Sequence, residues 1–371
     1  MLNNERLNRV NTTLKARQKI FLEILPLLFH TNSMDLPGYV SKKTPIGIAD
    51  YSPSKKCIDE TKKISKNFKY ARKAMRGFAI HALYLMGSSG TIAYSAKSDF
   101  DIWICHDPEL KKSQVALLRE KSDAISKWAD SRGLEVIFCV LSAETMRQGM
   151  TESLSEESSG TAQDILLKEE FYRTSLHIAG RTPAWWLVPP EHEHEHDEYL
   201  AGLIKKGLID EIDIIDFGSV GELPAGDFFG AGLWQLHKAL GSPYKSVLKL
   251  LVMEAYANEY PNVQLLSNQM KQAVYNGETK IDALDSYILI YNKLEDYLKS
   301  RNELERLDFV RRCFYFKVNL KLSDSNSRSA QYRYEVMSEL TKDWGWGGDD
   351  FKYLDSHTKW KVNQVMDERN V

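Results

Sequence analysis

The 371 residues are enough for two domains, and 43% of them are hydrophobic, which is ordinary for a globular protein. The 49 Lys and Arg residues nearly balance the 51 Asp and Glu residues, so the net charge of −2 argues against nucleic acid or an anionic membrane as a partner. No stretch approaches the roughly 18 uninterrupted apolar residues of a membrane-spanning helix. The four cysteines are widely spaced, which suits a reducing compartment, and we expect a cytoplasmic protein.

The first 77 residues are expected to form a helical segment and a connector. Residues 1–30 have a helical pattern, and the polar start lacks the apolar core of a signal peptide. Residues 31–56 contain Gly, Pro and Ser and are expected to be irregular, whereas the basic residues 57–77 favour a helix.

Residues 78–160 are predicted to form an α/β core. Three short apolar runs rich in branched and aromatic residues indicate strands, at 81–87, 101–106 and 134–141. A helical pattern fills the interval before the third run and ends at Gly133. The order strand, turn, strand, helix, strand predicts a small mixed sheet with helices.

Residues 161–371 are predicted to form a second, all-helical domain, so the predicted fold class is α+β. A polar Gly/Ser-rich stretch at 149–162 precedes this part and is expected to be a surface loop. Helices are expected near 163–179, 197–206, 226–258, 264–276, 282–298, 302–321, 328–343 and 356–371. The run EHEHEHDEY at 191–199 is interpreted as a polar surface loop without a functional metal.

The stretch MGSSGTIAYSAKSDFDIWIC, residues 86–105, carries the clearest chemical signal. Asp99 and Asp101 are two residues apart, so in a strand they project from the same face. Two adjacent carboxylates repel each other unless a cation lies between them, and Mg²⁺ prefers oxygen ligands. The turn at Gly87 and Ser88 offers backbone N–H groups and a hydroxyl to phosphate oxygens. Each feature alone is common at a solvated strand end, but the combination indicates a nucleotide site.

Gly-Ser, about ten residues, and then Asp-x-Asp before an apolar residue resembles the signature of the nucleotidyltransferase superfamily, which includes DNA polymerase β. The resemblance implies a third carboxylate on the next strand, and Glu135 at the start of the third predicted strand fits that place. Asp99, Asp101 and Glu135 would then be both the catalytic residues and the ligands of two Mg²⁺ ions, with Mn²⁺ as a possible substitute. Gly87 and Ser88 would bind the β- or γ-phosphate.

Longer blocks resemble the catalytic part of the class I, enterobacterial-type adenylate cyclases. They include LPGYVSKKTPIGIADYSP (36–53), YLMGSSGTIAYSAKSDFDIWICH (84–106), ILLKEEFYRTSLHIAGR (165–181) and RLDFVRRCFYFKV (306–318). The resemblance implies that ATP is converted to 3′,5′-cyclic AMP and pyrophosphate through attack of the ribose 3′-hydroxyl on the α-phosphorus. It also implies regulation by sugar phosphotransferase-system proteins through a C-terminal region that this chain is expected to lack.

Five further residues are predicted to contact the nucleotide. Arg173 and Arg181 are eight residues apart, on one face of the predicted helix, and the resemblance places both near the nucleotide. In related two-domain nucleotidyltransferases a lysine of the helical domain reaches the triphosphate, which makes Lys238 and Lys245 candidates. Trp103 shares a face with Asp101, and it either borders the nucleotide or belongs to the core.

Two other functions use the same carboxylates. One is an enzyme that adds a nucleotide to an external acceptor, and the other is a catalytically silent nucleotide-binding module. The near-neutral charge argues against a polynucleotide acceptor. In the cyclase interpretation the carboxylates come from the α/β part and the lysines from the helical part, so ATP is predicted to lie in a cleft between them.

Overall fold

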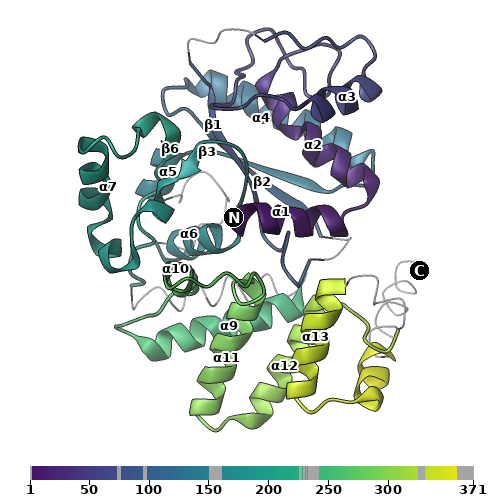
Figure 1. Cartoon of the computed structure of the whole chain (residues 1–371), viewed down its shortest axis with the longest axis vertical. Helices are drawn as coiled ribbons and strands as arrows, with labels where there is room; N and C mark the ends of the chain where they lie inside the picture. The colour runs from purple at the N-terminus through teal and green to yellow at the C-terminus, as the bar shows by residue number, and fades with distance from the viewer. Residues whose placement is uncertain are drawn as a thin grey trace.

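A computed structural model shows the α/β part of the chain above a stack of helices (Figure 1). The structure describes residues 2–72, 77–94, 98–149, 161–224, 228, 230, 232, 242–324 and 331–356. Within these ranges, none of the helices has the length and apolar character that crossing a bilayer requires.

A four-stranded mixed sheet is the centre of the α/β part. Its strands are β1 (Ile80–Met86), β2 (Phe100–His106), β3 (Val136–Ser142) and β4 (Leu176–Gly180), in the order β3-β2-β1-β4. Strand β1 is antiparallel to both of its neighbours, whereas β2 and β3 are parallel. Parallel neighbours need a crossover connection, and helix α4 (Lys112–Asp130) supplies it. The expected small mixed sheet, with its three predicted strands, is confirmed.

One face of the sheet is covered by the N-terminal helices and α4 (Figure 1). The N-terminal helices are α1 (Leu2–Thr13), α2 (Ala16–His30) and α3 (Lys55–Ile64). Phe21 of α2 and Ile125 of α4 are fully buried against Ile102 and Ile104 of β2. Even-numbered positions of β2 thus belong to this core, because alternate side chains of a strand point to opposite faces.

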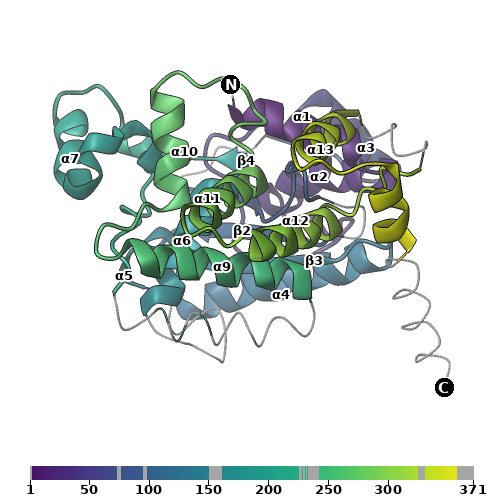
Figure 2. The ribbon, with the colours of Figure 1, turned by 90° about the horizontal axis from the view of Figure 1, so that it is seen from below.

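The opposite face of the sheet packs on α6 (Thr161–Thr174) and joins the core of the helical part. Trp103 of β2 stacks on Phe171 of α6 with ring centroids 4.9 Å apart. The same apolar cluster continues into the helices of the lower part of Figure 1, which Figure 2 shows from below. These helices are α9 (Pro243–Glu259), α10 (Leu266–Tyr275), α11 (Ser286–Ser300), α12 (Leu304–Val318) and α13 (Gln331–Asp343). The α+β class with a following helical domain is confirmed.

Short elements connect the two parts. They are α5 (Ala143–Gln148), α7 (His196–Lys205) and a two-stranded parallel sheet of β5 (Thr182–Pro183) and β6 (Ile214–Ile215). The EHEHEH run, predicted to be a surface loop, instead forms a 3₁₀ helix (Pro190–Glu195) and the start of α7. It is anchored by Glu193, which accepts hydrogen bonds from Trp185 Nε1 and Lys271 Nζ, both at 2.7 Å.

The prediction of one helix over 163–179 is wrong at its end, because α6 stops at Thr174 and strand β4 begins at Leu176. Pairing with the free edge of β1 satisfies the backbone groups of this segment, which outweighs its local helical pattern. Gly180 has φ +93°, and a Cβ atom there would lie 2.2 Å from His81 O, so only glycine allows this approach. The domain boundaries at 77 and 160 stay a prediction, although β4 belongs to the sheet.

Candidate active site

The Gly-Ser turn directly follows β1 and lies beside the second aspartate. Gly87 has φ +84°, a backbone conformation that favours glycine, and its N–H donates to Thr174 Oγ1 at 3.3 Å. A Cβ atom at Gly87 would lie 3.2 Å from Asp101 Oδ2. Ser88 is partly exposed, and its hydroxyl is 3.4 Å from Ser98 Oγ. The turn and the Asp101 carboxylate therefore adjoin, as a phosphate-metal site requires.

The three predicted carboxylates share one face and one end of the sheet. Asp101 pairs with Met86, the last residue of β1. Phe100 pairs with Val136, and the Phe100 N–H donates to Glu135 O at 2.9 Å, so Asp99 lies beside Glu135. Odd-numbered residues of β2 and β3 face the helical part, and the Asp99 and Glu135 side chains are exposed.

The donor set suits a hard divalent cation, because all three candidates offer carboxylate oxygens. These oxygens do not converge tightly, however. Among the described residues, His196, Asp197 and Asp216 are the group whose potential ligand atoms all lie within 4.8 Å of one another. The predicted carboxylates thus fit Mg²⁺ by chemistry and by shared face, but they are not drawn together around one point.

Lysines of α9 approach this face from the helical part. Lys249 Nζ forms an ion pair with Glu170 at 2.8 Å, whereas Lys245, one turn earlier, has no hydrogen bond or ion pair among the described residues. Tyr287 raises the pKa of Lys245 above its ordinary value, and the carboxylates of Glu170, Asp101 and Asp99 add to this despite burial. Lys245 is therefore a charged, partly buried ammonium close to the predicted metal ligands.

A small cavity separates these lysines from the Gly-Ser turn. It is lined by Gly87, Glu170, Arg173, Thr174, Lys245, Leu248, Lys249, Ser286, Tyr287 and Ile290. Its volume is about 10 Å³, which is room for about one water molecule. This volume is too small to enclose a nucleotide.

Arg173 lines this cavity but is held by protein groups. It is 5% exposed, its Nε donates to Glu169 Oε1 at 2.9 Å, and it also bonds to the Ser286 hydroxyl. Glu169 accepts the Ser267 N–H at 3.0 Å, so Arg173 and Glu169 tie α6 to the starts of α10 and α11. This arrangement favours a role in shaping the cavity wall.

Arg181 lies far from the turn, contrary to the expectation that it shares a helical face with Arg173. It follows β4, its N–H donates to His81 O at 2.8 Å, and its guanidinium is 3.4 Å from His81 Nδ1. His81 is near the start of β1 and Gly87 follows its end, a separation of roughly 20 Å for six residues at strand rise. The sequence pattern failed here because a strand replaced the predicted helix.

The two remaining predicted nucleotide contacts are Trp103 and Lys238. Trp103 is 5% exposed and stacked on Phe171, so its ring fills the core, which is the alternative role that the sequence left open. Lys238 lies outside the described residues. The predicted contact of Trp103 with a nucleotide gains no support from this packing.

Sequence reasoning missed Lys317 of α12. Its Nζ donates to Ala93 O at 3.3 Å and lies 5.2 Å from the centre of the Tyr287 ring, and it has no ion pair among the described residues. Burial, followed by the charge of Lys245, lowers the pKa of Lys317 to about 8, whereas Asp99 raises it. Lys317 is thus within electrostatic reach of Asp99. Its position as a cation within the apolar run FYFKV was the available signal.

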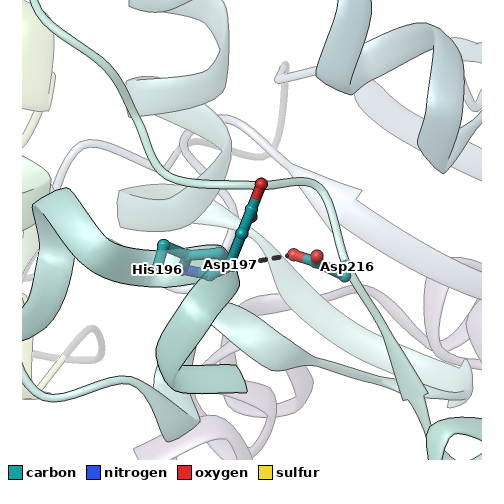
Figure 3. Close-up of side chains that lie close together, drawn as sticks. All are labelled: His196, Asp197 and Asp216. Atoms are coloured by element: carbon teal, nitrogen blue, oxygen red, sulfur yellow. Dashed lines mark hydrogen bonds and ion pairs between the residues drawn. The ribbon is translucent and has the colours of Figure 1, made fainter. Parts of the chain in front are cut away.

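The compact group of His196, Asp197 and Asp216 lies apart from this site, between α7 and β6 (Figure 3). His196 Nε2 and Asp216 Oδ1 are 2.9 Å apart, and Arg147 forms ion pairs with both aspartates. A guanidinium already occupies the place that a metal ion would take between these carboxylates. We interpret the group as an ion-pair network that fastens α7 to β6 and to α5.

Comparison with known protein families shows to which family the chain belongs. Residues 1–186 match the family described as "Adenylate cyclase NT domain", and residues 223–371 match "Adenylate cyclase, class-I, second domain". The chain belongs to the class-I adenylate cyclase family. This confirms the resemblance inferred from the sequence blocks, and both matched regions contribute to the candidate site.

Curated members of the class-I adenylate cyclase family resemble the chain along nearly all of its length. It is 37% identical over 355 residues to the adenylate cyclase of Yersinia intermedia, covering 95% of the chain and 42% of that protein. The adenylate cyclases of Proteus mirabilis and Escherichia coli strain K12 are each 36% identical, over 100% and 98% of the chain and 43% of each relative. The chain therefore spans less than half the length of these relatives. No solved structure matches it.

Proposed function

We propose that this chain is an adenylate cyclase that converts ATP to 3′,5′-cyclic AMP and pyrophosphate. The observation that carries the proposal is the juxtaposition of Asp101 with the Gly-Ser turn, facing two lysines of the helical part that lack a carboxylate partner among the described residues. Burial lowers the pKa of Lys317, and Lys245 forms no ion pair among the described residues, so both lysines are able to pair with an anionic ligand. The relatives named adenylate cyclase support ATP as that ligand.

Asp99, Asp101 and Glu135 would hold divalent metal, proposed as two Mg²⁺ ions with Mn²⁺ as a substitute. Bound there, the metal would lower the pKa of the ribose 3′-hydroxyl and neutralise charge on the phosphates. Asp99 and Glu135 are exposed, so their carboxylates are accessible to a metal ion.

The other groups of the site would bind and orient the triphosphate. The backbone at Gly87 and the Ser88 hydroxyl are proposed to donate to the β- or γ-phosphate, which the absence of a side chain at Gly87 permits. Lys245 and Lys317 are proposed to neutralise the leaving pyrophosphate from the opposite side. Neither part of the chain holds all of these groups, so ATP would lie between the sheet and α9–α12.

The test is to incubate the chain with ATP and Mg²⁺ and to measure cyclic AMP and pyrophosphate. Equal amounts of both, with none from an Asp101→Asn variant, support the proposal. A nucleotide transferred to an added alcohol, amine or RNA acceptor would instead identify an acceptor-dependent nucleotidyltransferase. Tight ATP binding without either product would identify a silent nucleotide-binding module.

We infer a cytoplasmic enzyme, supported by its ATP substrate and by the sequence composition. Regulation by sugar phosphotransferase-system proteins stays a prediction from the family resemblance.

A further inference from the structure

The backbone after the Gly-Ser turn is held by side chains from the far end of the chain. Tyr332 Oη donates to Thr91 O at 3.1 Å, and Arg333 Nε donates to Ile92 O at 2.9 Å. In the same segment, the Ile92 N–H donates to Asp285 Oδ2 at 2.7 Å. Helices α11 and α13 thus bind a segment that lies about 190 to 240 residues earlier in the chain.

This segment is buried to a degree that is unusual for a loop. Thr91, Ile92 and Ala93 are each at most 1% exposed, and the Arg333 side chain that reaches them is itself buried. Buried backbone carbonyls need partners, and here the partners are side chains of the helical part instead of a neighbouring strand. The conformation of the segment consequently depends on the position of α13.

The held segment is joined directly to the turn. The Thr91 N–H and the Thr91 hydroxyl both donate to Ser88 O, at 3.0 and 2.7 Å. Moving Thr91 therefore moves the Ser88 peptide. Arg333 also donates to Val318 O, next to Lys317, so one guanidinium links the turn segment to the end of α12.

We infer that Tyr332 and Arg333 are positioning residues, which hold the Gly-Ser turn and Lys317 in the relative placement that binding of the triphosphate requires. The inference rests on the proposed function, because the turn and Lys317 are assigned to phosphate there. Helix α13 would thereby control the geometry of the site through three backbone carbonyls: Thr91 O, Ile92 O and Val318 O.

The test uses Tyr332→Phe, which removes one hydroxyl and keeps the ring, and Arg333→Lys and Arg333→Met. Because Tyr332→Phe removes one hydrogen bond, we expect it to lower kcat/KM for ATP and to raise the pyrophosphate inhibition constant, each about 3- to 10-fold. Arg333→Met should lower kcat/KM for ATP at least about 10-fold. Arg333→Lys should recover part of that loss, since lysine can still donate to one carbonyl. Tyr353→Phe and Arg312→Lys are matched controls at exposed positions and should change neither quantity.

A purely structural role would lower the unfolding midpoint without changing pyrophosphate inhibition of the folded enzyme. Wild-type kinetics and inhibition in both Tyr332→Phe and Arg333→Lys would overturn the inference. If the wild-type chain makes no cyclic AMP, the proposed function fails separately, and the inference is then judged by calorimetric ATP affinity. In that case Tyr332→Phe should still weaken ATP binding about 3- to 10-fold, and an unchanged affinity would refute it.

Discussion

Two lysines one turn apart on α9 should respond differently to the same substitution: one variant should lose stability, and the other should lose activity. Lys249 pairs with Glu170 at 2.8 Å, and both side chains are only about a fifth exposed, at 21% and 22%. Lys245 has no such partner among the described residues, although it lies near Asp99 and Asp101. Changing each lysine to Met keeps most of the length of the side chain and removes the charge.

The expected magnitudes follow from these contacts. Removing one partner of a fully buried pair costs about 3–5 kcal/mol, so Lys249→Met should lower the free energy of unfolding by about 2 kcal/mol at this partial exposure. Lys245→Met breaks no ion pair among the described residues and should lower the free energy of unfolding less than Lys249→Met does. A charge-assisted contact to phosphate is worth roughly 1.5–3 kcal/mol, so Lys245→Met should lower kcat/KM for ATP about 10- to 100-fold.

Urea unfolding and steady-state cyclic AMP production on the same preparations would measure both effects. Lys299→Met is a suitable control, because Lys299 is exposed at the surface of α11. If Lys245→Met lost stability as Lys249→Met does, or kept full activity, the assignment of Lys245 to the triphosphate would be wrong.

Three further predictions concern other parts of the molecule. Asp101→Asn should reduce cyclic AMP formation at least about 100-fold, because metal catalysis contributes several kcal/mol, while the unfolding midpoint stays near that of the wild type. Arg181→Ala should leave the KM for ATP within about twofold, since Arg181 lies at the far end of β1, and a large increase would contradict that placement. Burial, followed by Arg181, lowers the pKa of His81 to about 4, so the native state resists protonation and stability should fall as pH drops from 6.5 to 4. His81→Gln should remove up to about 3 kcal/mol of that loss in unfolding titrations, whereas equal pH profiles for variant and wild type would refute it.

The parts of the fold that were predictable depend on local patterns. β1, β2 and β3 are apolar runs bounded by turns, and the glycine at 87 marks a conformation that other residues rarely adopt. β4 was missed because Leu176–Gly180 forms a strand only through its pairing with β1, about 90 residues away. Its short sequence continues the helical pattern of α6.

The candidate site was predictable on the sheet side and less so on the helical side. The spacing of Asp99 and Asp101 places both on one face wherever a strand forms. The approach of Lys317 to Asp99, by contrast, depends on how α12 packs, which no local spacing encodes. The prediction for Arg173 and Arg181 failed for a different reason. An eight-residue spacing indicates a shared face only while the helix continues.

A crystal structure with Mg²⁺ and an ATP analogue that cannot cyclise would test the location of the nucleotide most directly. We predict a triphosphate between Ser88 and Lys245, an α-phosphate beside Asp99 and Asp101, and a ribose 3′-oxygen within about 3–3.5 Å of the α-phosphorus in a reactive pose. A nucleotide bound wholly within the helical part, or a ribose facing an open channel toward an external acceptor, would contradict it.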